Sequence, residues 1–249
     1  MLNAFVYMFK DKSFAKKYIS LFGILLTANL LINWSGTLSP ELNVGPTSIW
    51  YYILFFAGFI TMFISYGYSI SLLRAKIDDA SVNELPSINI VKNFVAGFKV
   101  VLSGSLLVIL AVLFLYAMYF LNNILVKNIG NSVSVVINTI LFLAFFIVSF
   151  FFISMCCRYV VKPSFFNFLN FRAAAQLIKC NVSKYFKSFL MTALCMSVVY
   201  LISMLSVSVL VMLGYFGLVL YCVVVSILWA YQIYVFAGLF SNAVITDKI

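Results

Sequence analysis

Between Lys187 and Asp247 the chain runs for 59 residues without one charged side chain. A soluble domain does not bury such a stretch, but a bilayer does. Its hydrocarbon core is about 30 Å thick and takes about 20 apolar residues per helical span. Four further charge-free runs occupy 18–40, 42–73, 100–126 and 128–157. The sequence therefore predicts an all-α fold, a polytopic helical bundle in a membrane.

The number of spans follows from the lengths of these runs. The last run is long enough for two helices of about 25 residues and a turn, which we expect Gly214 and Gly217 to supply. Three spans would need about 60 residues before any loop, so we expect six spans in all. Their expected bounds are 18–34, 47–74, 100–123, 133–157, 188–212 and 217–241.

The positions of lysine and arginine predict the orientation of these spans. With six spans, 15 of the 16 basic residues fall on one side and only Lys127 falls on the other. Both termini and the two basic loops are therefore expected in the cytoplasm. No small-x-small cleavage site ends the first span, which is expected to be a retained signal anchor. We thus expect a multi-pass protein of the cell membrane.

The net charge of +10 is also typical of proteins that bind nucleic acid. Here the basic residues flank the expected spans, where they fix topology and meet anionic lipid headgroups. The lipid bilayer is therefore the expected partner, and nucleic acid is not.

Each pair of spans is preceded by a basic, amphipathic segment that we expect to lie as a helix along the cytoplasmic interface. These segments are Phe5–Lys17, Ser87–Lys99 and Ser164–Lys187. In the second, Ile88, Val91, Val95 and Phe98 recur at helical spacing.

In each segment an acid or amide precedes a lysine by six residues: Asp11 and Lys17, Asn93 and Lys99, Asn181 and Lys187. Two interpretations are open. The transmembrane domain, 1–249, consists of three repeated units (1–85, 86–162 and 163–249), each an interfacial helix followed by a hairpin. Alternatively, every span entered from the cytoplasm carries a lysine at its edge without any repeat.

The chain has no histidine, and its six acidic residues all lie outside the expected spans. A Ser–His dyad is therefore impossible, and an intramembrane pair of catalytic aspartates is absent. No phosphate-binding loop of the G-x-x-x-x-G-K type occurs. We expect a protein that is not an enzyme and that has no cofactor and no metal site.

Two sets of residues are candidates for a functional role. The loop at 158–187 carries six basic residues and no acid, interleaved with phenylalanines, and is expected to contact a partner or anionic lipid. Its candidate contacts are Arg158, Lys162, Phe165, Phe168, Arg172, Lys179, Lys184 and Lys187. Alternatively, its phenylalanines pack under the protein's own helices.

The second set consists of polar residues inside the expected spans. They either form hydrogen bonds between helices or line a substrate path: Asn29, Asn33, Asn138 and Gln232.

Three short motifs carry a resemblance to a known family. They are Gly67–Arg74, Glu84-Leu85-Pro86 and Phe94–Gly97, followed later by Arg158-Tyr159 and Gln176–Lys179. With these motifs the chain resembles an uncharacterised prokaryotic membrane-protein family, domain of unknown function 4013 (DUF4013). An acid usual after the Leu-Pro is replaced here by Ser87 and Asn89. The resemblance implies six spans in a prokaryotic cytoplasmic membrane, and no reaction or ligand.

Two hypotheses for function remain. The first is a transport-linked component, either permease-like or an accessory to an exporter, whose cytoplasmic helices receive a partner such as a transport ATPase. The second is an adaptor that organises membrane or recruits partners or anionic lipid through its basic cytoplasmic face. A water-filled cavity would favour the first, and a solid bundle would favour the second.

Overall fold

The computed structural model describes residues 5–41, 49–78, 84–129, 150–161, 170–210 and 213–244, together with 140 and 147. Side chains are not described for 34–41, most of 106–129, 207–210 and 242–243. Within these ranges all regular structure is helical. The labelled helices are η1 (Tyr7–Lys10), α2 (Phe14–Glu41), α3 (Ile49–Asp78), α4 (Ile90–Ile129), α7 (Phe171–Cys180), α8 (Val182–Leu210) and α9 (Gly214–Val244). A further apolar helix spans Phe150–Val161.

The chain divides into two compact units. Unit 1 comprises Met1–Phe98 and Asn181–Ile249, and unit 2 comprises Lys99–Cys180. Helix α4 therefore gives its first turns to unit 1 and the rest to unit 2. These boundaries differ from those of the expected repeat, and the expectation of one domain stays a prediction.

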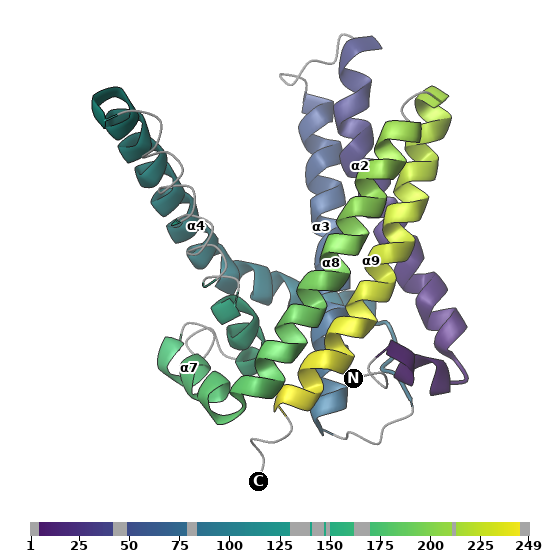
Figure 1. The fold of residues 1–249 in the computed structure, drawn as a ribbon. Helices are drawn as coiled ribbons and strands as arrows, with labels where there is room; N and C mark the ends of the chain where they lie inside the picture. The colour runs from purple at the N-terminus through teal and green to yellow at the C-terminus, as the bar shows by residue number, and fades with distance from the viewer. Residues whose placement is uncertain are drawn as a thin grey trace. The chain divides into compact units, whose positions relative to one another are not determined.

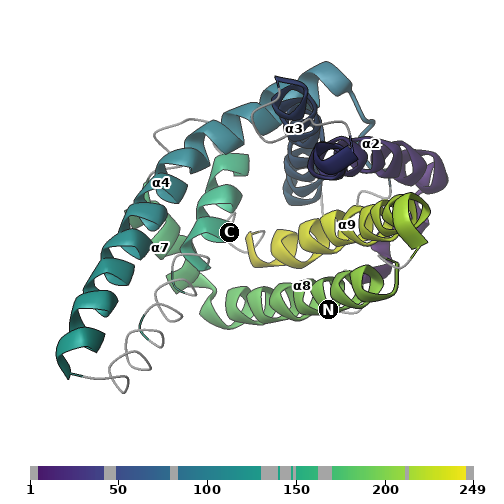
Figure 2. The ribbon, with the colours of Figure 1, turned by 90° about the horizontal axis from the view of Figure 1, so that it is seen from above.

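Unit 1 contains four long helices that lie side by side, α2, α3, α8 and α9 (Figures 1 and 2). Helix α9 packs against α2, α3 and α8, and α2 packs against α3. Four segments are long and apolar enough to cross a membrane: Phe14–Asn33, Ile49–Asp78, Val182–Ser206 and Gly214–Ser241. The prediction of a helical membrane protein is confirmed to this extent.

These four segments correspond to the first, second, fifth and sixth expected spans. The third, 100–123, lies wholly within the helix α4. Most of the fourth, 133–157, falls outside the described residues, and its end belongs to the helix at Phe150–Val161. The number six is thus not established by the described helices.

Large side chains fill the interior of unit 1. Tyr68 of α3, Tyr185 of α8, and Tyr234 and Phe240 of α9 have no exposed surface. The ring of Tyr185 meets that of Phe240 edge-on, with the two centroids 5.5 Å apart. Helix α9 supplies two of these four side chains and contacts the other three long helices, so it is the central helix of the unit.

The expected interfacial helices begin elsewhere than predicted. The second starts at Ile90 rather than Ser87, because the Asn89 side chain accepts the backbone N–H of Lys92 at 2.9 Å and caps the helix. It then continues into α4 as one element. Its buried face is formed by Asn93 and Gly97, whereas Val91, Val95 and Phe98 are exposed.

The other two segments are each interrupted, which corrects the expectation of one helix apiece. The first is broken between η1 and α2 at Asp11–Ser13, where side-chain hydrogen bonding competes with the helical pattern. The third is broken by a turn at Asn181 between α7 and α8.

One of the two glycines expected in the turn between α8 and α9 lies where α9 begins. Gly214 has φ of +58°, a left-handed conformation that glycine adopts without strain. Gly217 was wrongly assigned to the turn, because α9 already begins at Gly214 and Gly217 is buried within it.

Candidate functional site: a junction at one end of unit 1

A buried ion pair fastens the amino-terminal segment to the loop between α3 and α4. Oδ1 of Asp11 accepts the backbone N–H of Ser13 at 2.7 Å and its hydroxyl at 2.6 Å. Oδ2 accepts the backbone N–H of Leu85 at 2.7 Å and the ammonium group of Lys17 at 2.8 Å. Lys17 also donates to the carbonyl of Leu85. The side chains of Asp11 and Lys17 are only 3% and 17% exposed.

Three tyrosines connect this pair to α3 and α9. The hydroxyl of Tyr68 donates to the carbonyl of Pro86 at 3.3 Å and lies 3.3 Å from the hydroxyl of Tyr234. The hydroxyl of Tyr7 donates to the carbonyl of Tyr234 at 3.0 Å. The ammonium group of Lys76 lies 4.5 Å from the centre of the Tyr7 ring, within cation–π range. We call this cluster the junction: Tyr7, Asp11, Lys17, Tyr68, Leu85, Pro86 and Tyr234.

The electrostatics of the junction keep Asp11 ionised and Tyr7 protonated. Burial raises the pKa of the Asp11 carboxyl, but the hydrogen bonds from Lys17, Ser13 and Leu85 outweigh it and hold that pKa well below its ordinary value. Burial, with Tyr234 close by, raises the pKa of Tyr7 well above its ordinary value. Each group therefore stays in the state that its hydrogen bonds require.

A close helix crossing lies beside the junction, where α3 meets the first turns of α4. A Cβ atom at Gly67 would collide with the backbone of Asn93 and Gly97, and one at Gly97 would collide with the backbone of Phe63. Only glycine lets the two backbones approach so closely. The hydroxyl of Ser71 adds a hydrogen bond to Oδ1 of Asn93 at 3.3 Å. The crossing therefore fixes the position of the start of α4 against α3, and with it the end of the loop that joins them.

The predicted contact residues of the 158–187 loop are placed in both units. Arg158 is half-buried on the helix at Phe150–Val161, and Arg172 and Lys179 are exposed on α7. Lys184 and Lys187 are exposed on the first turns of α8. The remaining three lie outside the described residues: Lys162, Phe165 and Phe168.

The predicted intramembrane polar residues have separate surroundings. The amide of Asn29 donates to the Ser226 hydroxyl at 2.9 Å, which joins α2 to α9. The amide of Asn33 donates to the carbonyl of Asn29 in its own helix. Gln232 is buried, and its Nε2 has no hydrogen-bond partner among the described residues. Asn138 lies outside them.

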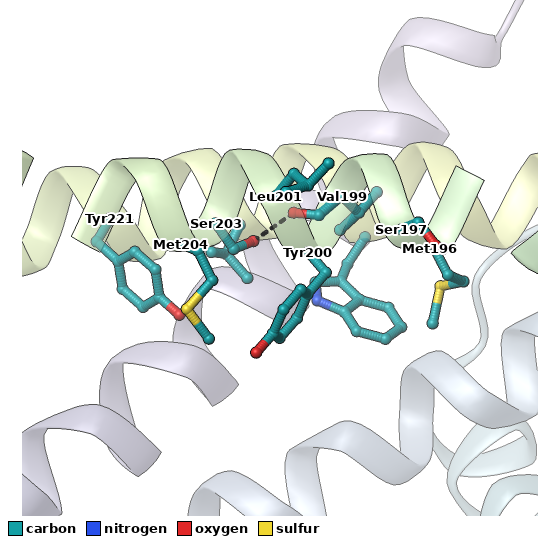
Figure 3. Close-up of a pocket in the computed structure, with 10 residues that line it drawn as sticks. Met196, Ser197, Val199, Tyr200, Leu201, Ser203, Met204 and Tyr221 are labelled. Carbon is teal, nitrogen blue, oxygen red and sulfur yellow. Dashed lines mark hydrogen bonds between the residues drawn. The ribbon is translucent and has the colours of Figure 1, made fainter. Parts of the chain in front are cut away.

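A groove of about 540 Å³ runs along α8 and α9. Met196 lies near one end of it and Tyr221 near the other, with Tyr200 between them (Figure 3). The hydroxyl of Ser203 donates to the carbonyl of Val199 at 2.7 Å, so its own helix satisfies it. The groove is lined by uncharged residues throughout.

Sequence reasoning found part of the junction and missed part. The spacing of Asp11 and Lys17 was recognised only as a possible repeat, and Tyr68 and Leu85 were recognised only as family motifs. Tyr234 was not singled out, because one tyrosine among 15 in an apolar chain carries no signal of its own. No group of three or more metal-ligating side chains occurs among the described residues.

Comparison with known proteins shows a family match. A family model described as "Protein of unknown function (DUF4013)" matches residues 51–208, more than half of the chain. The match includes the glycine crossing and Leu85-Pro86, and it excludes Asp11, Lys17 and Tyr234. No curated protein and no solved structure matches the chain.

Proposed function

The chain belongs to the DUF4013 family, and we propose that it is a non-enzymatic, six-span component of a prokaryotic cytoplasmic membrane with a transport-linked role, permease-like or accessory to an exporter. In this role the protein receives a partner, such as a transport ATPase, on its basic cytoplasmic face. The uncharged groove along α8 and α9 supports a neutral or apolar cargo over an ionic one.

The geometry of unit 1 supports an even number of crossings. Contacts of Tyr7 and Tyr68 with Tyr234 bring the start of α2 and the second half of α3 to the last turns of α9. The hydroxyl of Ser188 donates to the carbonyl of Leu239 at 3.0 Å, which brings the start of α8 to the same end. The chain between α3 and α8 therefore leaves and returns at one end. Two crossings there, at 100–123 and 133–157, make six, and three repeated hairpins fit this count.

The charge of that end supports a cytoplasmic orientation for it and for both termini. Basic residues stand there at the start of α2, the end of α3 and the starts of α4 and α8: Lys10, Lys12, Lys16, Lys17, Arg74, Lys76, Lys92, Lys184 and Lys187. Cytoplasmic segments next to spans carry this excess.

Helix α7 is the observation that carries the proposal. Its Ala173, Ala174 and Leu177 are buried, and within unit 2 the hydroxyl of Ser154 donates to the carbonyl of Ala174 at 2.9 Å. Its opposite face exposes Arg172 and Lys179. A short, firmly packed helix with an exposed basic face gives a partner protein a rigid element on which to act.

Photo-crosslinking tests this role. A photoreactive residue replaces Gln176, which is exposed on α7, and as a control replaces Ile53, which is 46% exposed on the apolar α3. We expect a protein adduct only at 176, with a nucleotide-hydrolysing subunit identified by mass spectrometry. The variant R172Q/K179Q/K184Q should lose this adduct, whereas K10Q/K12Q/K16Q, which removes the same charge, should keep it. Absence of any protein adduct at 176 would contradict the transport-linked role.

The adaptor hypothesis has its own supporting observation. The filled interior of unit 1, with Tyr68, Tyr185 and Tyr234 fully buried, resembles a solid bundle rather than a passage. Adducts at 176 with lipid, or with a protein that does not hydrolyse nucleotide, would favour an adaptor that organises membrane or recruits partners.

A further inference from the structure

The amino-terminal segment is held to unit 1 by one face only. Tyr7 is 9% exposed and Met8 has no exposed surface, so both are anchored in the unit. Phe9, by contrast, is 60% exposed, and its ring packs edge-on against Phe14 with the centroids 5.0 Å apart. The orientation of the segment, and hence of its outer face, is therefore fixed.

Three exposed lysines lie along this segment. Lys10 ends η1, Lys12 lies in the turn, and Lys16 lies in the first turn of α2; all three are exposed. Their ammonium groups form no ion pair or hydrogen bond within the described part of the chain. Their charge is available to a ligand.

The only acid in this segment does not neutralise them. Asp11 points inward, and both of its oxygens are occupied by Lys17, Ser13 and the backbone of Leu85. In the net charge of the sequence segment, the negative charge of Asp11 would offset one of the surrounding lysines. In the structure Asp11 instead pairs with Lys17, and the other three lysines have no ion pair among the described residues.

The depth of these lysines in a membrane follows from their position in the chain. The apolar stretch that can cross the bilayer begins at Phe14, so Lys12 and Lys16 flank its edge at the level of the headgroups. Val6 and Phe9 are exposed next to them and can enter the apolar boundary beneath the headgroups.

We propose that these exposed residues, Val6, Phe9, Lys10, Lys12 and Lys16, form a preformed binding site for the phosphodiester headgroup of an anionic phospholipid, held in shape by the Asp11–Lys17 pair. The complementary charge identifies the ligand as an anion, and the adjoining exposed apolar side chains identify it as a lipid rather than free phosphate. The site is independent of α7 and of any protein partner.

The test measures the thermal stability of the full-length protein in neutral detergent, with phosphatidylglycerol, phosphatidylcholine or inorganic phosphate added. We expect phosphatidylglycerol alone to raise Tm, and native mass spectrometry to show it bound. In K10Q/K12Q/K16Q the apparent affinity should fall on the order of tenfold or more. The control K92Q/K99Q/K127Q, which removes equal charge from residues outside both candidate contact surfaces, should keep it. Equal losses in both variants, or equal effects of all three additives, would overturn the proposal.

Asp11→Asn separates a shaped site from diffuse attraction. This change adds one positive charge to the segment, so simple attraction predicts tighter binding of phosphatidylglycerol. The proposed site predicts weaker binding, because the segment loses the pair that holds it. The measurement is made well below the melting temperature of the variant. Tighter binding would overturn the role of the pair, and if the variant does not fold, the two triple variants still decide the proposal.

Discussion

At the scale of single residues, Asp11 is the acid that holds the amino-terminal segment to the α3–α4 loop. It is buried, and it stays ionised because four donors surround its two oxygens. If the carboxylate were removed, the N–H of Leu85 would lose its acceptor, and the ammonium of Lys17 would lose its counter-charge and keep only the carbonyl of Leu85. The pair therefore links the amino terminus to a loop that is 74 residues away in sequence.

Asp11→Ala should lower the stability of the folded protein by about 3 kcal/mol, because removing one member of a buried pair leaves the other unpaired. In a protein of this size that corresponds to a Tm lower by about 6–12 °C. The measurement is thermal unfolding in detergent, followed by tryptophan fluorescence. Glu84→Ala is the matched control, because Glu84 is an exposed acid beside Leu85. Similar losses in both variants would contradict the role of the pair.

The same residue predicts a pH dependence. The pKa of Asp11 in the folded protein lies below its unfolded value of about 4. Its contribution to stability is therefore fully present above that value and is lost as the pH falls from about 4 toward the folded pKa. We expect the contribution of Asp11 to Tm to stay constant between about pH 8 and pH 5. Below about pH 4, Tm should fall more steeply in the wild type than in Asp11→Asn. A loss already complete at pH 5 and absent from Asp11→Asn would contradict the lowered pKa.

At the scale of helices, the crossing of α3 and α4 depends on two glycines. Gly67→Ala should destabilise the protein by about 1–3 kcal/mol or more, because the new methyl group meets backbone atoms that cannot rotate away. Gly23→Ala in α2 is the control, because a Cβ there meets nothing within 4 Å. It should leave Tm unchanged or raise it, since alanine favours a helix. Equal effects of the two changes would argue against the crossing.

The crossing also gives a physical reason for the family motifs. Gly67, Pro86 and Gly97 belong to three separate sequence motifs that suggested the family. In the structure Gly67 contacts the backbone at Gly97, and Tyr68, which follows Gly67, bonds to the carbonyl of Pro86. The three motifs thus hold one turn of the chain between α3 and α4.

At the scale of the whole molecule, the topology can be tested by labelling. Single cysteines replace Glu41, Lys127 and Asn170 in a chain whose five native cysteines are changed to alanine. A membrane-impermeant maleimide added to intact cells should label positions 41 and 127. Position 170 should react only after the membrane is permeabilised. Labelling of 170 from outside would refute the orientation, and failure to label 127 would refute the two crossings proposed at 100–123 and 133–157.

The sequence by itself determined the class of the protein and the approximate limits of the four described helices that are long and apolar enough to cross a membrane. Both depend on local properties, because hydrophobicity and run length decide whether a segment enters a bilayer. The family was also recognisable from short motifs. The ends of helices were less predictable, since they depend on local side-chain hydrogen bonds of Asn89 and Asp11 that compete with the helical pattern.

Only the tertiary structure decided which residues meet. Nothing local to Asp11 predicts that it binds the backbone at Leu85, and nothing local to Tyr234 predicts that it meets Tyr7 and Tyr68. In a chain that is 65% hydrophobic, many helix faces can pack against one another at similar cost. The choice among them depends on close fit, as at the glycine crossing, and on a few polar bonds between distant segments, such as the one from the N–H of Leu85 to Asp11. Those exist only once the helices are assembled.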